Sequence, residues 1–373
     1  MNGRERVLKA LELEEPDRVP LTEVDVEVPL MEDVLGKTFP AATSLQTQVL
    51  ADRRLEEKRT EFKVKFCRKV GFDLLILDLS APEGWVPKTL PGDLMVDLWG
   101  RVLRLDGKAK AWVPYSTVFN VPEDVEAFQT PDPEANGWTL SMELGVRMVD
   151  GEVAVAGFIR DPFALAWEML TPMKFVLWMY RERRFLEGLL EKLTKFNVKV
   201  VKRLGEVGVD FVVSGGDYCE ERGPMAPVWF FRDMVFPRLA KQVEAAHSRG
   251  LSFVKHTDGN IMPMLDDLAR LVDGLHSLDP SAGVDIGQVK AKYGDRLVLM
   301  GNVAVDSLAR KSMVEVVEET RRCVEKASPG GGHILSSSNS WAGGAKLANC
   351  LAMVEAGKKY GVYPKTSSAI EKR

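Results

Sequence analysis

The 373-residue sequence predicts a (β/α)8 barrel, the TIM-barrel fold in which eight parallel strands alternate with eight helices. Short apolar runs recur along the chain, and a segment with helical spacing of apolar residues follows nearly every run. Several runs are apolar on both faces, as the strands of a buried parallel sheet are. The runner-up is a doubly wound open sheet. No Gly-x-Gly-x-x-Gly follows the first run, which argues against that fold and its dinucleotide site.

The expected strands are apolar runs bounded by glycine, proline or polar residues. They cover residues 18–24, 71–78, 152–158, 209–214, 252–256, 274–277, 296–300 and 333–337. Helices are expected over residues 4–13, 46–70, 162–206, 231–249, 261–271, 284–293, 312–327 and 342–360. Residues 26–45 are expected to be irregular.

The rhythm of strands and helices is interrupted at about residues 80–150, where proline, glycine and tryptophan are frequent. Within this stretch residues 95–115 alternate in polarity around a turn at Asp106-Gly107, which predicts an inserted β-hairpin region after the second strand. We interpret the stretch as an insertion and not as a separate domain. The chain is therefore expected to be one domain over residues 1–373.

Composition excludes several classes of function. The formal net charge is only −4, so there is no basic field for nucleic acid. No apolar run reaches the roughly 18–20 residues that a membrane span needs. The four cysteines are widely spaced without a Cys-x-x-Cys pair, which is typical of reduced thiols in a cytoplasmic protein. Charges throughout the first 30 residues argue against a signal peptide.

In a barrel of this kind the chemistry lies at the carboxyl ends of the strands, so the polar residues there are the candidates for the site. Some are expected only to be solvated or to cap helices, because strands end in polar loops. The candidates for binding a substrate are Asp78, Arg160, Asp217, Asn302 and Ser337.

The pair His256 and Asp258 stands above this background, because an imidazole and a carboxylate at a strand exit have little use in a core. In one interpretation they bind Zn²⁺, with Glu220, Cys219 or a residue of the serine-rich loop as a further ligand. In the other, His256 is a general acid that Asp258 orients, and Tyr218 is a third catalytic candidate. A structural alternative is that Asp258 caps the helix that follows it.

Several motifs together resemble the uroporphyrinogen decarboxylase superfamily. They span nearly the whole chain, and they are Arg4-Glu-Arg-Val-Leu-Lys-Ala-Leu, Glu15-Pro-Asp-Arg-Val-Pro, His256-Thr-Asp-Gly-Asn, Gly301-Asn-Val, Gly330-Gly-Gly-His-Ile-Leu-Ser-Ser and Tyr360-Gly-Val-Tyr-Pro. The resemblance implies a (β/α)8 barrel with its cleft at the strand exits.

The resemblance also implies one of two chemistries. The true decarboxylases hold a tetrapyrrole polycarboxylate with an arginine-rich segment after the first strand and use no cofactor. Here that segment, residues 25–33, is acidic and contains no arginine. The cobamide-dependent methyltransferases carry a zinc site of the type His-x-Cys with a distant second Cys. His256 matches that His, but Asp258 stands at the first Cys, and the second position falls among residues 336–338, which are serines.

The resemblance, together with these differences, therefore implies a methyltransferase that moves a methyl group from a small O- or N-methylated compound, for example a methoxyaromatic, to a corrinoid carried by a partner protein. Aromatic donors are suggested by aromatic residues expected in loops near the mouth, Trp85, Tyr218, Trp229 and Trp341. A zinc ion and a homodimer are left open. The alternatives are a decarboxylase-like carboxy-lyase and a ligand-binding barrel without chemistry.

Overall fold

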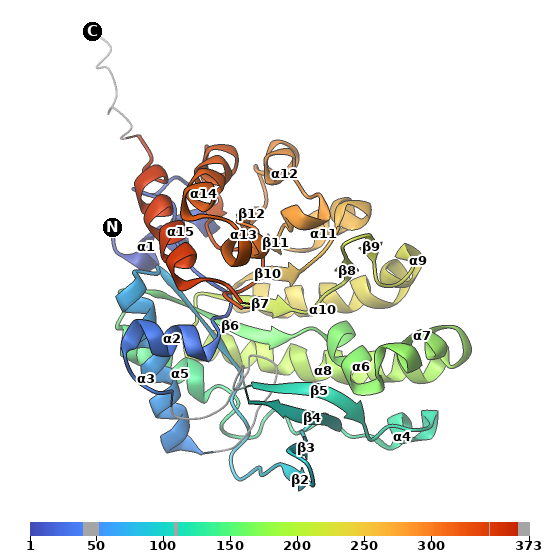
Figure 1. Ribbon diagram of the computed structural model, residues 1–373. Coiled ribbons are helices and arrows are strands. Elements are labelled where there is room, and N and C mark those ends of the chain that lie inside the picture. Colours follow the sequence, from blue (N-terminus) through green and yellow to red (C-terminus); the bar gives the residue numbers. More distant parts are fainter. Residues whose placement is uncertain (40–51, 108–110, 343, 365–373) are drawn as a thin grey trace.

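A parallel sheet that curls into a barrel forms the centre of the molecule, and helices surround it (Figure 1). The computed structural model describes residues 1–39, 52–107, 111–342 and 344–364. Seven parallel strands follow one another in the sheet in chain order, so each lies beside the strand of the next βα unit. They are β1 (Leu74–Asp78), β6 (Ala154–Arg160), β7 (Phe211–Gly215), β10 (Ser252–Thr257), β11 (Gly274–Ser277), β12 (Val298–Met300) and β13 (His333–Ile334).

Residues 19–24 supply the eighth position and close the barrel between β13 and β1. Leu335, just beyond β13, donates a backbone hydrogen bond to Pro20 at 2.9 Å. On the other side Asp73, immediately before β1, donates to the carbonyl of Leu21 at 2.8 Å. The predicted (β/α)8 barrel is thereby confirmed, although this first segment pairs through isolated bridges and not through a continuous ladder.

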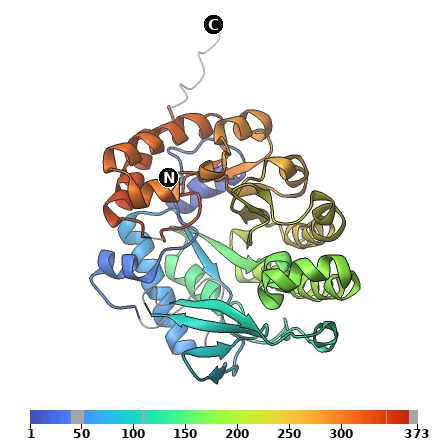
Figure 2. The same ribbon diagram turned by 45° about the vertical axis from the view of Figure 1, so that its right-hand side comes forward.

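Most of the helices cover the outside of the barrel (Figure 2). The longer ones are α1 (Gly3–Leu11), α2 (Val28–Leu35), α3 (Arg53–Val70), α5 (Leu140–Val149), α6 (Pro162–Leu170), α7 (Pro172–Arg181), α8 (Arg183–Val207), α10 (Phe236–His247), α12 (Ile286–Tyr293), α14 (Met313–Ala327) and α15 (Leu347–Tyr360). Shorter ones are α4 (Pro122–Ala127), α9 (Val228–Phe230), η1 (Phe231–Val235), η2 (Met262–Met264), α11 (Leu265–Leu271), η3 (Pro280–Ala282) and α13 (Val305–Arg310). Within the described ranges, no helix is both long enough and apolar enough to span a membrane.

Alternate residues of each strand face the inside of the barrel, and this interior is a packed apolar core. It consists of Val7, Ala10, Val24, Leu74, Ile76, Ala154, Ala156, Phe158, Phe211, Val213, Val254, Val298, Met300 and Ile334. Two of these residues, Val7 and Ala10, come from α1. This helix therefore closes the inside of the barrel at the amino-terminal ends of the strands. The carboxyl ends of the strands are thus where inward-facing positions become polar.

An antiparallel sheet of four strands is inserted after β1. It is formed by β2 (Lys88–Leu90), β3 (Leu94–Val96), β4 (Arg101–Asp106) and β5 (Ala111–Thr117). The predicted hairpin region is confirmed as β4 and β5, whereas β2 and β3 have three residues each and are too short for their alternation to be recognised. The barrel resumes at α5, within the stretch that the sequence assigned to the insertion.

Two other expectations about local structure need correction or lie partly outside the described residues. The stretch 26–45, expected to be irregular, contains the helix α2, whose start is favoured by Pro29 in its first turn. The expected helix over 46–70 begins at Arg53 as α3, with Asp52 as its N-cap, and residues 46–51 lie outside the described ranges.

A buried chain of charges ties the inserted sheet to the barrel. Arg101, on β4, is fully buried and donates from Nε to Asp97 at 2.7 Å. Its Nη1 donates to Glu168 on α6, and Glu168 also accepts from Nε of Arg160 at 3.0 Å. Two guanidinium groups and two carboxylates therefore compensate one another, so that none of the four is an isolated buried charge.

The buried His333 holds the amino-terminal end of β13 in place. Its Nε2 donates to the carbonyl of Gly301 at 2.8 Å, which leaves Nδ1 to accept from the hydroxyl of Ser328 at 2.8 Å. Burial lowers the pKa of His333 from its usual 6.5 to about 4. The neutral ring therefore has a structural task at this end of the strand.

Replacement of His333 by glutamine is expected to weaken the loss of stability in acid. The unfolded chain binds a proton at His333 below pH 6.5 while the folded chain does not until about pH 4, so acidification through this window lowers the free energy of unfolding. The wild type should lose about 1.4 kcal/mol per pH unit more than His333→Gln within it. Urea unfolding of both proteins at pH 4.5, 5.5 and 6.5 measures this, and a pH-independent difference would contradict it.

Candidate functional site

The strand register brings one row of polar positions together at the carboxyl end of the barrel. Arg160 at the end of β6 pairs with Gly215 at the end of β7, and Gly215 pairs with His256 on β10. His256 in turn lies beside His276 on β11. The alternation of inward and outward positions places these residues directly above the apolar interior.

The imidazole of His256 faces two carboxylates. Its Nε2 is 3.7 Å from Oδ1 of Asp217, two residues beyond β7, and 3.9 Å from Oδ1 of Asp258, just beyond β10. The three groups each offer one ligand atom within 4.8 Å of the others. Because the side chain of Asp217 is 35% exposed and that of Asp258 is 27% exposed, the cluster is accessible from solvent.

Backbone contacts between the two loops hold the carboxylates in this arrangement. The amide of Asp258 donates to Oδ1 of Asp217 at 3.1 Å, and the amide of Asn260 donates to the carbonyl of Glu220 at 2.9 Å. Gly259 has φ +80° and lies so close to Glu220 that an added Cβ would be 2.5 Å from its carbonyl oxygen. Only glycine fits there, so the Gly-Asn turn is what lets the β7 and β10 loops meet.

Burial and like charge set the protonation of the cluster. The pKa of Asp258 is raised to about 8, first by burial and then by the neighbouring carboxylate of Asp217. The pKa of His256 is lowered to about 3, first by burial and then by the positive charges of Lys255 and Arg160. Oδ1 of Asp258 is buried and has no hydrogen-bond partner among the described residues. This group of acceptors is therefore suited to hold a cation, either a proton or a metal ion.

The serine-rich loop after β13 supports the cluster from one side. Asn339 donates from Nδ2 to Oδ2 of Asp258, which orients that carboxylate. The hydroxyl of Ser337 donates to Glu23 at 2.9 Å, and its backbone amide donates to the same carboxyl group. Burial raises the pKa of Glu23 to about 8. The loop is thus held by the first segment of the barrel while it contacts the site.

Of the predicted metal ligands, His256 and Asp258 lie in the cluster, and its third member is the carboxylate of Asp217. Cys219 and Glu220 belong instead to the short hairpin of β8 (Cys219–Glu220) and β9 (Gly223–Pro224). Cys219 is buried and its pKa is raised to about 12, mainly by burial, so its thiol is protonated. Glu220 is exposed.

The phenol of Tyr218 points away from the cluster. Its hydroxyl donates to Asp161 at 2.7 Å, and the ammonium of Lys255 lies 4.0 Å from the centre of its ring. Both partners are buried on the outer side of the strands, and Lys255 also donates to the carbonyl of Gly216 at 2.6 Å. The geometry gives Tyr218 the task of fixing the strand ends and provides no support for a catalytic role.

The remaining candidates for substrate binding have partners within the fold. Asp78 accepts from Lys63 at 3.1 Å, and Arg160 is bound to Glu168 as described above. Asn302 donates to the carbonyl of Leu278 at 2.6 Å. Asp78 and Asn302 thus serve first to fix the loops at the mouth.

The aromatic residues expected near the mouth fall into different environments. Trp341 is fully buried and packs against Phe66 and Phe72 on the outer side of the barrel, so it is not available to a ligand. Trp229 on α9 is 41% exposed. Trp85 is partly buried in the loop before the inserted sheet.

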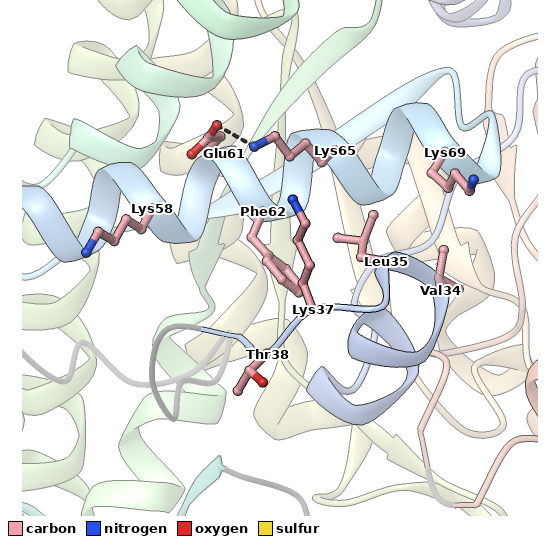
Figure 3. A pocket seen from close by; sticks show the side chains of 9 residues that line it. All are labelled: Val34, Leu35, Lys37, Thr38, Lys58, Glu61, Phe62, Lys65 and Lys69. Atoms are coloured by element: carbon pink, nitrogen blue, oxygen red, sulfur yellow. Dashed lines mark hydrogen bonds and ion pairs between the residues drawn. The ribbon is translucent and has the colours of Figure 1, made fainter.

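A separate pocket of about 440 Å³ lies between α2 and α3 (Figure 3). Its apolar part is formed by Val34, Leu35 and Phe62, and its rim carries lysines. Figure 3 shows these lysines directed to different sides, with Lys65 turned towards Glu61, its ion-pair partner. Because the lysines do not converge and no residue of the cluster lines this pocket, it is distinct from the candidate site.

The sequence pointed to His256, Asp258 and Asp217 but missed the role of His276. The ring of His276 lies against that of His256, with 2.7 Å between the two Nδ1 atoms. The available signal was that each histidine stands at the carboxyl end of its own strand, on neighbouring strands. The register that brings the two rings together is visible only in the structure.

Comparison with known proteins places this barrel in a family. The family model described as uroporphyrinogen decarboxylase (URO-D) matches residues 90–360. The chain is 24% identical to the uroporphyrinogen decarboxylase of Alkalilimnicola ehrlichii over 89% of this chain and 87% of that protein. It is also 24% identical to the uroporphyrinogen decarboxylase of Coxiella burnetii, over 64% of this chain and 68% of that protein.

Methyltransferases are among the similar proteins as well. The chain is 25% identical to the methylcobamide:CoM methyltransferase MtaA of Methanosarcina barkeri, over 57% of this chain and 60% of that protein. Among solved structures, a methyltransferase from Methanosarcina mazei superposes with a TM-score of 0.75 at 21% identity, covering 96% of this chain and 99% of that one. This likeness shows the fold. The match of the family model over residues 90–360 establishes that the chain belongs to the uroporphyrinogen decarboxylase (URO-D) family.

Proposed function

We propose that this protein is a methyltransferase that moves a methyl group from a small O- or N-methylated compound, such as a methoxyaromatic, to a corrinoid carried by a partner protein. The observation that carries the proposal is the cluster of Asp217, His256 and Asp258 at the carboxyl end of the barrel. The similarity to a methylcobamide methyltransferase supports the same reaction class.

The cluster fits a divalent metal ion. It offers one imidazole nitrogen and two carboxylate oxygens, and one of these oxygens is buried without a hydrogen-bond partner among the described residues. Nitrogen and oxygen ligands of this kind suit Zn²⁺ and other first-row divalent ions. When bound, such an ion would supply Lewis-acid stabilisation of the oxygen or nitrogen that loses its methyl group.

The absence of thiolate ligands bears on the choice of substrate. Thiolates favour soft metals and the activation of thiols, whereas a ligand set of one histidine and two carboxylates is harder. The side chains themselves can also assist a leaving oxygen. The raised pKa of Asp258 keeps its carboxyl group protonated at neutral pH when no cation is bound, and that proton can be given to the departing group. Both features favour an O- or N-methyl donor over a methylthiol.

The partner follows from the chemistry. A reduced corrinoid would supply the nucleophile that takes the methyl carbon, so it must reach the open side of the cluster, where Asp217 is partly exposed. In this proposal the protein acts in the cytoplasm with a separate corrinoid protein, and the barrel contributes the methyl donor site.

A decarboxylase-like carboxy-lyase is the second candidate, because most of the curated relatives described above are decarboxylases. The charges beside the first segment argue against a polycarboxylate substrate. Residues 25–33 contain no arginine. Asp25 is partly buried and interacts with the charges of the Lys63–Asp78 ion pair, and desolvation raises the pKa of Asp25 to about 6. An arginine clamp for carboxylates is therefore missing from this segment.

Transfer of an isotope label tests the proposal. The purified protein, supplied with zinc, is incubated with reduced corrinoid and a panel of trideuteromethyl ethers and trideuteromethyl amines. We expect the labelled methyl group on the corrinoid, detected by visible absorbance and mass spectrometry, and no transfer by His256→Ala. No label transfer from any donor, combined with release of carbon dioxide from uroporphyrinogen, would favour the carboxy-lyase.

A further inference from the structure

Two neighbouring histidines form a hydrogen bond through the same ring atom. Nδ1 of His256 and Nδ1 of His276 are 2.7 Å apart, with the ring planes inclined by 30°. Both rings are buried, His276 to 1% exposure. Since a hydrogen bond needs one donor and one acceptor, exactly one of these nitrogens carries a hydrogen, and the tautomers of the two rings are coupled.

The hydrogen-bond partners of the other ring nitrogen of His276, Nε2, determine which of the two Nδ1 atoms carries the hydrogen. Its Nε2 is 3.2 Å from the backbone carbonyl of Ser337, which can only accept, and 3.1 Å from the hydroxyl oxygen of Ser336. The hydroxyl of Ser336 itself donates to the Ser337 carbonyl at 2.7 Å, so its oxygen is left to accept. Two acceptors facing one nitrogen require that Nε2 of His276 carries the hydrogen.

The hydrogen on Nε2 of His276 in turn determines the tautomer of His256. None of the hydrogen-bond partners of His276 is a carboxylate that would stabilise an imidazolium, so the ring is neutral and its Nδ1 is an acceptor. Nδ1 of His256 must then be the donor, which leaves Nε2 of His256 with a free lone pair. That lone pair is directed to the side where Asp217 and Asp258 lie, at 3.7 and 3.9 Å.

We propose that His276 is a positioning residue that fixes His256 in its Nδ1–H tautomer, so that Nε2 of His256 is a permanent ligand for a divalent cation between Asp217 and Asp258. The metal assignment rests on the proposed function, whereas the tautomer does not. In the opposite tautomer Nε2–H would occupy the centre of the cluster and exclude a metal ion. We call the two hydrogen bonds of His276, one to the Ser337 carbonyl and one from His256, the relay. The relay therefore keeps the site in the form that can bind a cation.

The tautomers can be measured directly, because the chain has only four histidines. Protein labelled with ¹⁵N-histidine and stripped of metal by chelation is examined by long-range ¹H–¹⁵N correlation, and His256→Gln, His276→Gln and His333→Gln assign the ring signals. We expect Nδ1–H for His256 and Nε2–H for His276. His333, whose Nε2 donates to a carbonyl, is an internal reference for the Nε2–H form. A wild-type His256 in the Nε2–H form would overturn the proposal.

Zinc binding supplies a second measurement. His276→Leu removes both hydrogen bonds of the relay, whereas His276→Gln keeps an amide that can accept from His256 and donate to Ser337. Loss of a residue that orients a ligand typically weakens metal binding by about 10–100-fold. We expect that loss in His276→Leu, with most of it recovered in His276→Gln, by competition with a zinc chelator.

The outcomes separate the relay from the proposed function. Equal zinc affinity in the wild type and His276→Leu would overturn the relay, even if methyl transfer is found. The expected tautomers and zinc affinities would support it, even if no methyl donor is accepted. The cobalt(II) absorption spectrum of each variant reports the ligand geometry independently of turnover, and we expect it to change in His276→Leu and to be restored in His276→Gln.

Discussion

Replacement of Asp258 by asparagine is expected to reduce the affinity for zinc by more than about 100-fold, since even residues that only orient metal ligands contribute about 10–100-fold. The variant keeps the shape of the side chain and the acceptor for Asn339, but it removes the carboxyl group next to Nε2 of His256 that would be negatively charged when a metal ion is bound. If the proposed function holds, methyl transfer should fall with metal content. Isothermal titration with zinc and the isotope-label assay measure the two effects.

Asp279→Asn is the matched control for this prediction. Asp279 also follows a strand of the barrel, but its carboxylate accepts from the amide of Ser281 at the start of η3 and is not part of the cluster. Zinc affinity should be unchanged in this variant. A large loss in Asp279→Asn, or no loss in Asp258→Asn, would show that a cation binds elsewhere in the protein.

Replacement of Arg101 by methionine is expected to destabilise the protein by about 3–5 kcal/mol, because it leaves buried charges without their partner. Asp97 would lose its only guanidinium contact among the described residues, and Glu168 would retain Arg160 alone. Urea unfolding monitored by tryptophan fluorescence measures the change, since Trp99 packs against Trp138 and Phe196 beside this network.

The matched control is Arg104→Met on the same strand. Arg104 is exposed and lies over the ring of Tyr115, so its removal should cost less than about 1 kcal/mol. A similar cost for both substitutions would mean that the buried chain of charges contributes no more than an exposed arginine.

The sequence predicted the barrel because its strands are apolar runs that the helical segments separate. It placed the candidate site at the strand exits because His256, Asp258 and Asp217 stand at the ends of such runs. It assigned Tyr218 to the site because the β7 loop was read as one group of polar residues. In the structure the turn at Gly215 and Gly216 sends Tyr218 to the outer side, where it meets Asp161, and no spacing rule anticipates that reversal.

The relay behind His256 was beyond prediction for a related reason. Contact between His256 and His276 depends on the register of β10 against β11, and the tautomer depends on the Ser337 carbonyl, 61 residues further along the chain. Neither relation leaves a periodic pattern in the sequence. The second carboxylate of the cluster, Asp217, is predicted from sequence only as a substrate contact, because the distance between two loops cannot be read from their compositions.

The contact between Glu23 and Ser337 joins residues 314 positions apart and has a consequence for the synthesis of the protein. A ribosome produces Asp217, His256 and Asp258 well before the loop that carries Ser336, Ser337 and Asn339. Until that loop emerges, His276 has no acceptor to set its hydrogen and Asp258 has no Asn339 to orient it. The nascent chain therefore carries Asp217, His256 and Asp258 before the loop that supports them exists, and the cluster takes its final arrangement only when the barrel closes.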